Sequence, residues 1–212
     1  MDQARAAPGR ATSAVRARML DAAYELFSRR GIRAVGVNEI IKRAHVSKGT
    51  LYHHFASKDD LVIAFLKLRE QRWTLAWVEG EARRRGKTPQ DRLLAIFDLF
   101  DEWFHRTDFE ACSFINVLLE MGGDHPAGRA SLGHLANIRA VIQKLASEAG
   151  LHDANDFALS WHILMKGSIV AAPEGYPDAA EHAKAMAIRL IESHQEPLQQ
   201  RSNRAATKRS RS

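Results

Sequence analysis

Apolar residues recur at intervals of three and four along most of this chain, the spacing that places side chains on one face of an α-helix. No convincing alternation of apolar and polar residues, which is typical of a half-buried strand, accompanies them. The pattern therefore predicts an all-α protein of about nine helices. We expect an N-terminal three-helix head followed by a larger helical body.

Glycine and capping residues mark the expected helix boundaries. The first helix carries an apolar stripe from Val15 to Phe27 and is expected to end at Gly31. Its successors are a short helix near residues 37–44, a helix capped by Ser47 and a longer one from Ser57 towards Gly80. In the body, helices are predicted over about residues 89–104, 112–121, 126–149, 155–168 and 178–194.

The composition is that of a protein with a substantial core. Of 212 residues, 45% are hydrophobic and 26% are charged, which excludes wholesale disorder. The apolar runs are too short to span a membrane and no secretory signal is recognisable, so we expect a cytoplasmic protein with no membrane contact. The single cysteine, Cys112, excludes an intrachain disulfide and a zinc site built from several cysteines of this chain.

Charge is unevenly distributed along the chain. Residues 1–58 hold 11 basic and 4 acidic side chains, a net charge of +7, whereas residues 59–196 hold 15 and 21, a net charge of −6. Residues 197–212 add five basic side chains and no acid. Because basic residues neutralise DNA phosphates, a basic head on an acidic body favours nucleic-acid binding, and random drift in charge is the alternative. The expected domains are disordered basic ends at 1–12 and 197–212, a DNA-binding head at 13–56, and a ligand-binding and dimerisation body at 57–196.

Residues 37–55 have the layout of a helix-turn-helix, with a tight connection around His45 and Val46. The apolar positions are spaced to pack the two helices together, which leaves one face of the second helix outward. In such motifs the second helix enters the major groove of duplex DNA and its N-terminal residues meet the base edges. The outward residues here are Lys48, Gly49, Thr50, Tyr52 and His53.

The segment Ala44-His-Val-Ser-Lys-Gly-Thr-Leu-Tyr-His-His-Phe55, followed by Ser57-Lys-Asp59, resembles the DNA-binding region of the TetR family of bacterial transcription regulators. The resemblance covers about residues 15–65. There are two departures: His45 stands at a turn position where the family usually has Gly, and Gly36 stands where Ser or Thr usually caps the second helix. The second departure is expected to cost only a few tenths of a kcal/mol, because Gly is tolerated as a helix cap.

The resemblance implies that Lys48, Gly49 and Thr50 face bases and nearby phosphate, and that Tyr52 and His53 contact the DNA backbone. Lys58 is expected to bind a phosphate at a helix N-terminus, which offers unpaired N–H groups to an anion. Arg16 and Arg43 are further candidates for phosphate contact, with solvated surface as the equal alternative. The full predicted DNA-binding set is Arg16, Gly36, Val37, Arg43, Ser47, Lys48, Gly49, Thr50, Tyr52, His53 and Lys58.

The body carries an aromatic stripe that either forms core or lines a pocket for an apolar effector. The resemblance favours the pocket, because the bodies of this family commonly enclose a small-molecule site. The predicted effector-binding set is Phe97, Phe100, Trp103, Phe104, Cys112, Phe114, Asn116 and Trp161. A second possibility is that Cys112 senses oxidants directly, although the acidic residues Asp108 and Glu110 nearby in sequence would raise its pKa if they lie close to it.

Small residues in the last two helices allow close approach of helices, and the resemblance implies a two-fold, four-helix dimer interface there. The predicted interface set is Leu164, Gly167, Ser168, Ala180, Ala183, Met186, Ala187 and Leu190. A homodimer would present two recognition helices to a palindromic operator in double-stranded DNA.

Ten histidines raise the question of a metal site, but none of their spacings is that of a metal-binding helix, and we expect no metal or other cofactor. No glycine-rich phosphate loop or nucleophile elbow indicates an enzyme. The sequence therefore predicts a repressor that a small apolar effector releases from its operator. An unregulated architectural DNA binder and an enzyme with a DNA-binding head are the alternatives.

Overall fold

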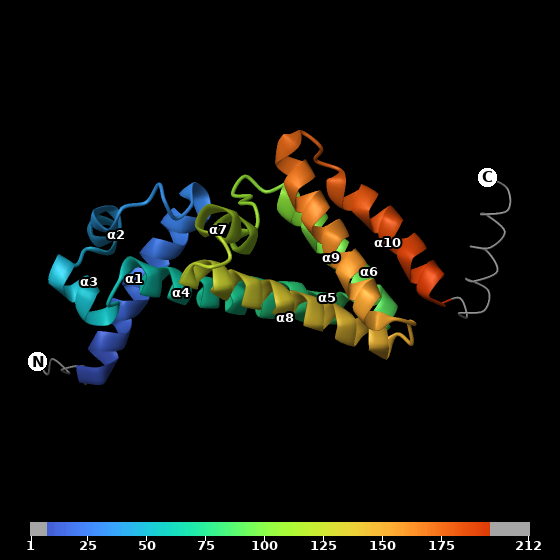
Figure 1. Cartoon of the computed structure of the whole chain (residues 1–212), viewed down its shortest axis with the longest axis horizontal. Coiled ribbons are helices and arrows are strands. Elements are labelled where there is room, and N and C mark those ends of the chain that lie inside the picture. Colours follow the sequence, from blue (N-terminus) through green and yellow to red (C-terminus); the bar gives the residue numbers. More distant parts are fainter. Residues whose placement is uncertain (1–7, 196–212) are drawn as a thin grey trace, which may run out of the picture. The chain divides into compact units, whose positions relative to one another are not determined.

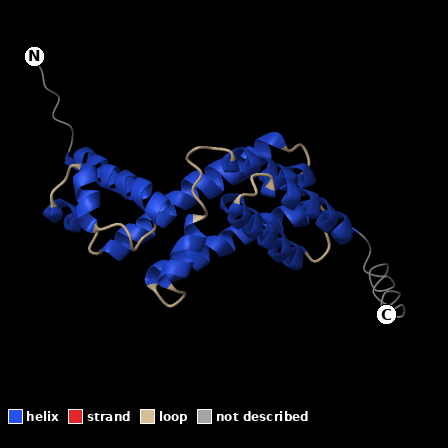
Figure 2. Ribbon diagram, turned by 90° about the horizontal axis from the view of Figure 1, so that it is seen from above, coloured by secondary structure: helices blue, strands red, loops and turns tan. Residues whose placement is uncertain are grey.

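The structure of this protein is a computed structural model that describes residues 8–195. Within that range it contains helices and loops and no strand, so the predicted all-α fold is confirmed (Figure 2). The elements are α1 (Pro8–Arg30), α2 (Val37–Ala44), α3 (Lys48–His54), α4 (Lys58–Arg69), the π-helical segment η1 (Glu70–Glu79), α5 (Gly80–Arg85), α6 (Pro89–Phe104), α7 (Ser113–Met121), α8 (Pro126–Glu148), α9 (Ala154–Ala171), the 3₁₀ turn η2 (Ala172–Glu174) and α10 (Ala179–Gln195) (Figure 1).

Two boundaries differ from the expectation. Helix α1 is described from Pro8 onward, so residues 8–12 are helical rather than disordered, in keeping with the helix propensity of the alanine and arginine among them. The helix that starts at Lys58 does not end near Gly80 but continues through η1 and α5 to Arg85. The other residues predicted to be disordered, 1–7 and 197–212, lie outside the described range.

Local capping explains where several helices begin and end. Thr88 and Asp91 form a reciprocal capping box at the start of α6, with Thr88 accepting from the Asp91 N–H at 3.1 Å and Asp91 from the Thr88 N–H at 2.9 Å. Ser57 caps α4 by accepting from the Asp60 N–H at 3.1 Å. Gly31 ends α1 in the left-handed region, at φ 79°, as the sequence predicts.

The described helices form two compact units, which we call the first unit (residues 8–72 and 110–135) and the second unit (residues 73–109 and 136–195). In the first unit, α2 and α4 pack on α1 and α3 packs on α2. The fully buried ring of Phe65 from α4 meets those of Tyr24 and Phe27 from α1 edge-on, each at 5.5 Å between centroids.

In the second unit, α9 and α10 form an antiparallel pair and both pack against α6 (Figure 1). The buried rings of Phe97 in α6 and Trp161 in α9 lie 5.2 Å apart. Lys184 of α10 forms an ion pair with Asp98 of α6. This packing decides which faces of α9 and α10 remain at the surface.

His162 of α9 is buried in the second unit, and its Nδ1 has no hydrogen-bond partner. Burial, together with the charges of Lys166 and Arg139, lowers the pKa of His162 to about 3. In the unfolded chain this residue takes up a proton near pH 6.5, whereas in the folded protein it stays neutral until the pH is close to 3. Folding stability is therefore lost as pH falls from about 6.5 towards 3.

We expect the wild-type protein to lose up to about 1.4 kcal/mol of unfolding free energy per pH unit through this residue below pH 6. A His162→Leu variant lacks that component, so urea denaturation at pH 7 and pH 5 should give a shallower pH dependence for the variant. The exposed His182, replaced by Leu, serves as the control. Equal pH dependence of wild type and His162→Leu would contradict the assignment.

Candidate functional site

The helix-turn-helix of the first unit is built from α2, α3 and a three-residue connection. Ile40 and Leu51 are fully buried and Ala44 is 4% exposed, so the inward faces of both helices are those predicted from the sequence. His45 closes α2 in the left-handed conformation, at φ 52° and ψ 52°, and the Val46 N–H returns to the carbonyl of Ile41 at 3.2 Å. The turn therefore has the geometry for which glycine is usually chosen, reached here with histidine.

A non-glycine residue in the left-handed region carries a backbone strain of about 1 kcal/mol. His45 is exposed, so a His45→Gly variant removes this strain without removing core packing. We expect the free energy of unfolding of the variant to be higher by about 1 kcal/mol, with the DNA-binding face unaltered. Chemical denaturation measures the change, and a loss of stability would show that the His45 side chain supports the turn.

Ser47 and Thr50 act within the recognition helix itself. The Ser47 Oγ accepts from the Thr50 N–H at 3.0 Å and lies 2.8 Å from the Thr50 Oγ1. The predicted DNA-binding hydroxyl of Thr50 is thus engaged by the helix cap. Gly36 caps α2 in an extended conformation that any residue can adopt, and Val37, which follows it, is half-buried.

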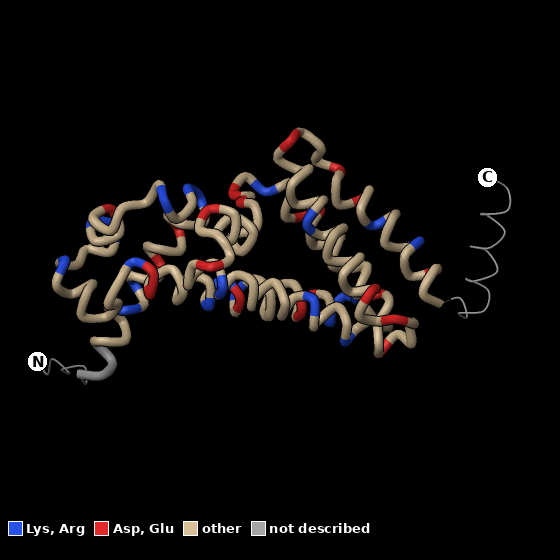
Figure 3. Tube along the Cα trace, viewed as in Figure 1, with Lys and Arg blue, Asp and Glu red and all other residues tan. Residues whose placement is uncertain are grey.

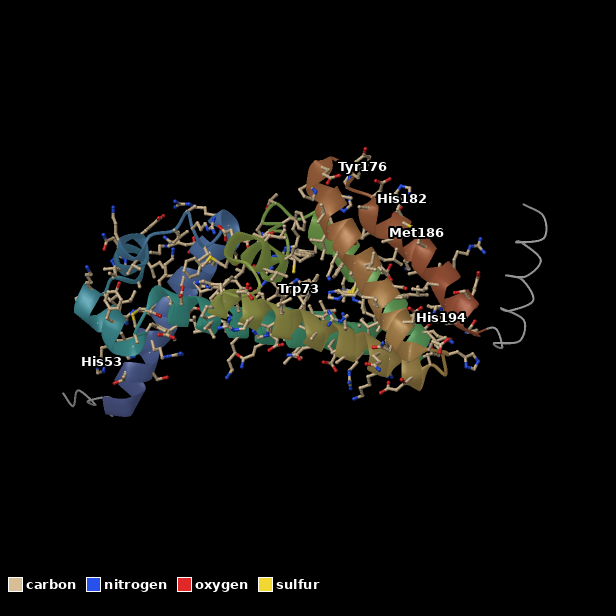
Figure 4. All side chains as sticks on the ribbon, viewed as in Figure 1. His53, Trp73, Tyr176, His182, Met186 and His194 are labelled. Carbon is tan, nitrogen blue, oxygen red and sulfur yellow. The ribbon has the colours of Figure 1, made fainter. Side chains whose placement is uncertain are left out.

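The outward face of α3 is open to solvent. Lys48 and Gly49 at its N-terminal end are exposed, and so are Tyr52 (41%) and His53. Lys48 begins the helix, basic positions occur in this part of the trace in Figure 3, and His53, labelled in Figure 4, lies at the end of the first unit that carries α3. This surface of about two helical turns therefore presents an ammonium group, a glycine without a side chain, a phenol and an imidazole to solvent.

Three other cations that the sequence places at DNA already make contacts within the first unit. Arg43 donates to both carboxylate oxygens of Glu25, at 2.6 and 2.7 Å, which lowers the pKa of Glu25 and raises that of Arg43. Arg16 lies over the ring of Phe55, 4.8 Å from its centroid. Lys58 donates to the carbonyl oxygen of Ile32 at 2.6 Å. Each therefore has a structural role, and a phosphate contact by any of them stays a prediction.

Comparison with known proteins relates this arrangement to a family. Residues 19–65, which span the helix-turn-helix, match the family model described as bacterial regulatory proteins, tetR family. The fold is similar to the crystal structure of a TetR-family transcriptional regulator from Streptomyces coelicolor, with a TM-score of 0.78 and 27% identity over 87% of this chain and 97% of that one. The helix-turn-helix segment of this chain therefore belongs to the TetR family.

Two curated relatives each match less than half of this chain. The transcriptional regulator QacR of Staphylococcus aureus is 30% identical over 88 residues, which are 42% of this chain and 47% of QacR. The transcriptional activator FasR of Mycolicibacterium smegmatis is 50% identical over 87 residues, which are 40% of this chain and 38% of FasR. The matched segments thus span less than half the length of either relative.

The predicted effector-binding residues are divided between the two units. The second unit holds five of them as buried rings: Phe97, Phe100, Trp103, Phe104 and Trp161. The first unit holds Cys112 and Phe114, which are buried, and Asn116, which is exposed on α7. Asn116 therefore does not lie within the apolar interior of its unit, as its apolar neighbours in sequence suggested, because it falls on the solvent side of α7.

Three aromatic residues that the prediction omitted belong to the same cluster of rings. Their ring centroids lie close to that of Trp103, at 5.4 Å for Trp73, 6.0 Å for Trp77 and 4.8 Å for Phe109. Trp73 is labelled in Figure 4, and its indole N–H is buried without a hydrogen-bond partner, as is that of Trp161. The spacing of Trp73 and Trp77 by four residues was a usable signal, because it places both rings on one face of a helix.

The acidic neighbours of Cys112 are themselves paired with arginines. Glu110 lies 3.5 Å from Arg29 and 3.6 Å from Arg69, and Asp108 lies 2.7 Å from Arg106. Each of these carboxylates therefore has an arginine partner, and direct sensing of oxidants by Cys112 stays a prediction.

The predicted dimer residues fall on two different faces of α9 and α10. Four of them, Ser168, Ala180, Ala183 and Ala187, are at most 4% exposed and pack these helices inside the protomer. Their predicted contact with a second copy is therefore wrong, because a side chain that the protomer itself covers has no surface left to offer. The other four, Leu164, Gly167, Met186 and Leu190, retain exposed surface.

Leu164, Met186 and Leu190 border a shallow groove of about 370 Å³ between α9 and α10, and Gly167 does not line it. Met186 lies on its outer side together with Tyr176 and His182 along the same edge of the helix pair (Figure 4). The sequence prediction missed Ile163, which lines the groove and is 59% exposed. Further exposed apolar residues on the two helices are Leu159 and Val170 of α9 and Ile188 of α10.

Proposed function

We propose that this TetR-family protein is a sequence-specific transcription regulator that binds duplex DNA through α3. The observation that carries the proposal is the exposed face of Lys48, Gly49, Tyr52 and His53 on a helix whose opposite face is anchored by the buried Leu51. Lysine and tyrosine are donors suited to phosphate and base edges, and Gly49 leaves room for a close approach of the backbone. The basic charge of residues 1–58 favours approach to DNA.

The proposed active form is a homodimer joined through the exposed apolar faces of α9 and α10. Ile163 and Met186 are 59% and 53% exposed, and together with Leu164 and Leu190 they line one groove, so they form an exposed apolar patch of the kind that marks an interaction site. A two-fold axis through this face would place two recognition helices on half-sites of a palindromic operator, spaced by about 34–36 Å or a multiple of it.

The proposed regulation is release from the operator by a small apolar molecule bound in the body. The aromatic cluster around Trp103 supports an apolar ligand, and the unpartnered indole N–H groups of Trp73 and Trp161 are the kind of sparse polar groups that orient one. Repression is the proposed outcome, although the related FasR is named as an activator. Action on bacterial DNA implies the cytoplasm, and within residues 8–195 no helix is long and apolar enough to cross a membrane.

The test is selection of genomic DNA fragments by the purified protein, followed by sequencing of the retained fragments. A regulator of this kind retains a small set of fragments that share a two-fold motif. Expression of the adjacent genes in a deletion strain then distinguishes repression from activation. Retention of all fragments alike would favour an architectural DNA binder, and no retention would contradict the proposal.

A further inference from the structure

Helix α7 lies more than fifty residues beyond the helix-turn-helix in sequence, yet its last turn contacts the segment that leads into α2. The carboxylate of Glu120 accepts two backbone hydrogen bonds, from the Ile32 N–H at 2.8 Å and from the Arg33 N–H at 3.1 Å. These amides follow the end of α1 at Gly31, so α1 offers them no continuing helical ladder. One side chain thus satisfies both.

The Ile32 peptide segment is held from a second side. Lys58, at the start of α4, donates to the carbonyl oxygen of Ile32 at 2.6 Å. The Ile32 side chain is only 2% exposed, so its position is also defined by packing. Together, the carboxylate, the ammonium group and the buried side chain leave this short segment little freedom.

Gly31 gives independent evidence that the carboxylate is closely fitted to the turn. A Cβ at this position would lie 2.8 Å from the Glu120 Oε1, inside van der Waals contact. The left-handed φ of Gly31 explains why the turn needs glycine, and the close approach shows that the carboxylate occupies the space a side chain would take. Sequence reasoning assigned only the first of these roles.

The segment from Ile32 to Gly36 determines where α2, and with it α3, leaves α1. It has no helical structure of its own, so its path depends on contacts such as those of Glu120. Other residues beyond position 109 also contact the N-terminal helices within the first unit. Glu110 pairs with Arg29 of α1, and the Nε2 of His125 lies 3.3 Å from the Oδ2 of Asp59 in α4. Of these three residues, only Glu120 accepts hydrogen bonds from the backbone of residues 32–36, which we call the entry segment.

We infer that Glu120 is a positioning residue for DNA binding, whose carboxylate holds the backbone at Ile32 and Arg33 and thereby sets the placement of the recognition helix. This inference rests on the proposed DNA-binding function. Glu120 touches no DNA in this scheme and acts through the α1–α2 segment. Helix α7 thereby becomes part of the DNA-binding apparatus although it lies outside the sequence of the helix-turn-helix.

The first test needs no DNA. Amide hydrogen exchange of Ile32 and Arg33, followed by NMR in the full-length protein, should accelerate about tenfold or more in Glu120→Ala, because a hydrogen bond to a charged acceptor is lost. Glu120→Gln retains one acceptor oxygen and should lie between the variant and the wild type. Unchanged exchange at both amides in Glu120→Ala would overturn the assignment of the contact.

The second test uses the sign of the effect on operator affinity. Removal of an acidic group from the first unit strengthens DNA binding if charge alone matters, whereas loss of positioning weakens it. We expect Glu120→Ala to bind the selected operator about tenfold more weakly and Glu120→Gln to recover part of that loss. Asp124→Asn, an exposed acid four residues away, is the matched control and should bind as tightly as wild type or more tightly.

Circular dichroism and thermal unfolding establish that each variant is folded at the assay temperature, and Glu120→Gln provides the comparison if Glu120→Ala is not. Operator affinity of a folded Glu120 variant equal to or above that of Asp124→Asn would overturn the positioning role, even with faster amide exchange. If the wild-type protein itself selects no operator, the proposed function fails, while the exchange measurement still decides whether Glu120 holds the entry segment.

Discussion

A Lys48→Ala variant is expected to bind its operator roughly 10- to 100-fold more weakly than wild type, with a salt dependence reduced by about one unit of slope. The reason is that Lys48 stands exposed at the first position of α3, where a recognition helix meets phosphate and base edges. Its side chain projects away from the buried face that Leu51 anchors, so folding should be unaffected. Fluorescence anisotropy at several salt concentrations measures both the affinity and the slope.

Tyr52→Ala is expected to weaken binding similarly, and Tyr52→Phe separates the contribution of the hydroxyl group from that of the ring. Lys67→Ala is the control, because it removes one exposed positive charge from α4 of the same unit without altering α3. If Lys48→Ala and Tyr52→Ala match Lys67→Ala in affinity and in salt slope, α3 is not the recognition helix.

An Ile163→Glu variant is expected to be monomeric and to lose about 100- to 10,000-fold in operator affinity, because the second recognition helix no longer binds as part of one molecule. Ile163 is 59% exposed beside the groove between α9 and α10, so a glutamate there is tolerated by the protomer. Against a second apolar face, however, the carboxylate would be buried without a partner, at a cost of several kcal/mol. Sedimentation velocity measures the association state.

Ala183 belongs to the predicted interface set, but Ala183→Glu is unsuitable as a test of the dimer. Ala183 is 3% exposed and packs α10 within the protomer, so glutamate at that position disrupts folding rather than the interface. Leu132→Glu is the appropriate control for Ile163→Glu, since Leu132 is 46% exposed on α8 in the first unit and does not line the groove. Dimers of unchanged stability in Ile163→Glu would place the interface elsewhere.

The sequence alone was sufficient for the features that depend on neighbouring residues. Helix positions follow from apolar spacing. The caps at Ser57 and Thr88 follow from side chains that lie within four residues of the N–H groups they bind. The end of α1 at Gly31 follows from the ability of glycine to adopt a positive φ. The helix-turn-helix belongs to this class, because Ile40, Ala44 and Leu51 lie within twelve residues of one another and bury one another's helices. Even the left-handed turn at His45 was readable as a position where glycine is usual.

Only the tertiary structure decided features that join distant parts of the chain. The alanines of α10 illustrate why: a small residue permits close packing equally within a protomer and between protomers, and only the position of α6 and α9 shows that Ala183 faces inward while Met186 faces outward. The contact of Glu120 with Ile32 joins residues 88 positions apart, and a glutamate on a predicted helix carries no local sign of its partner. Periodicity identifies the apolar face of each helix, because it is a property of one helix; which neighbour covers that face is a property of the assembled fold.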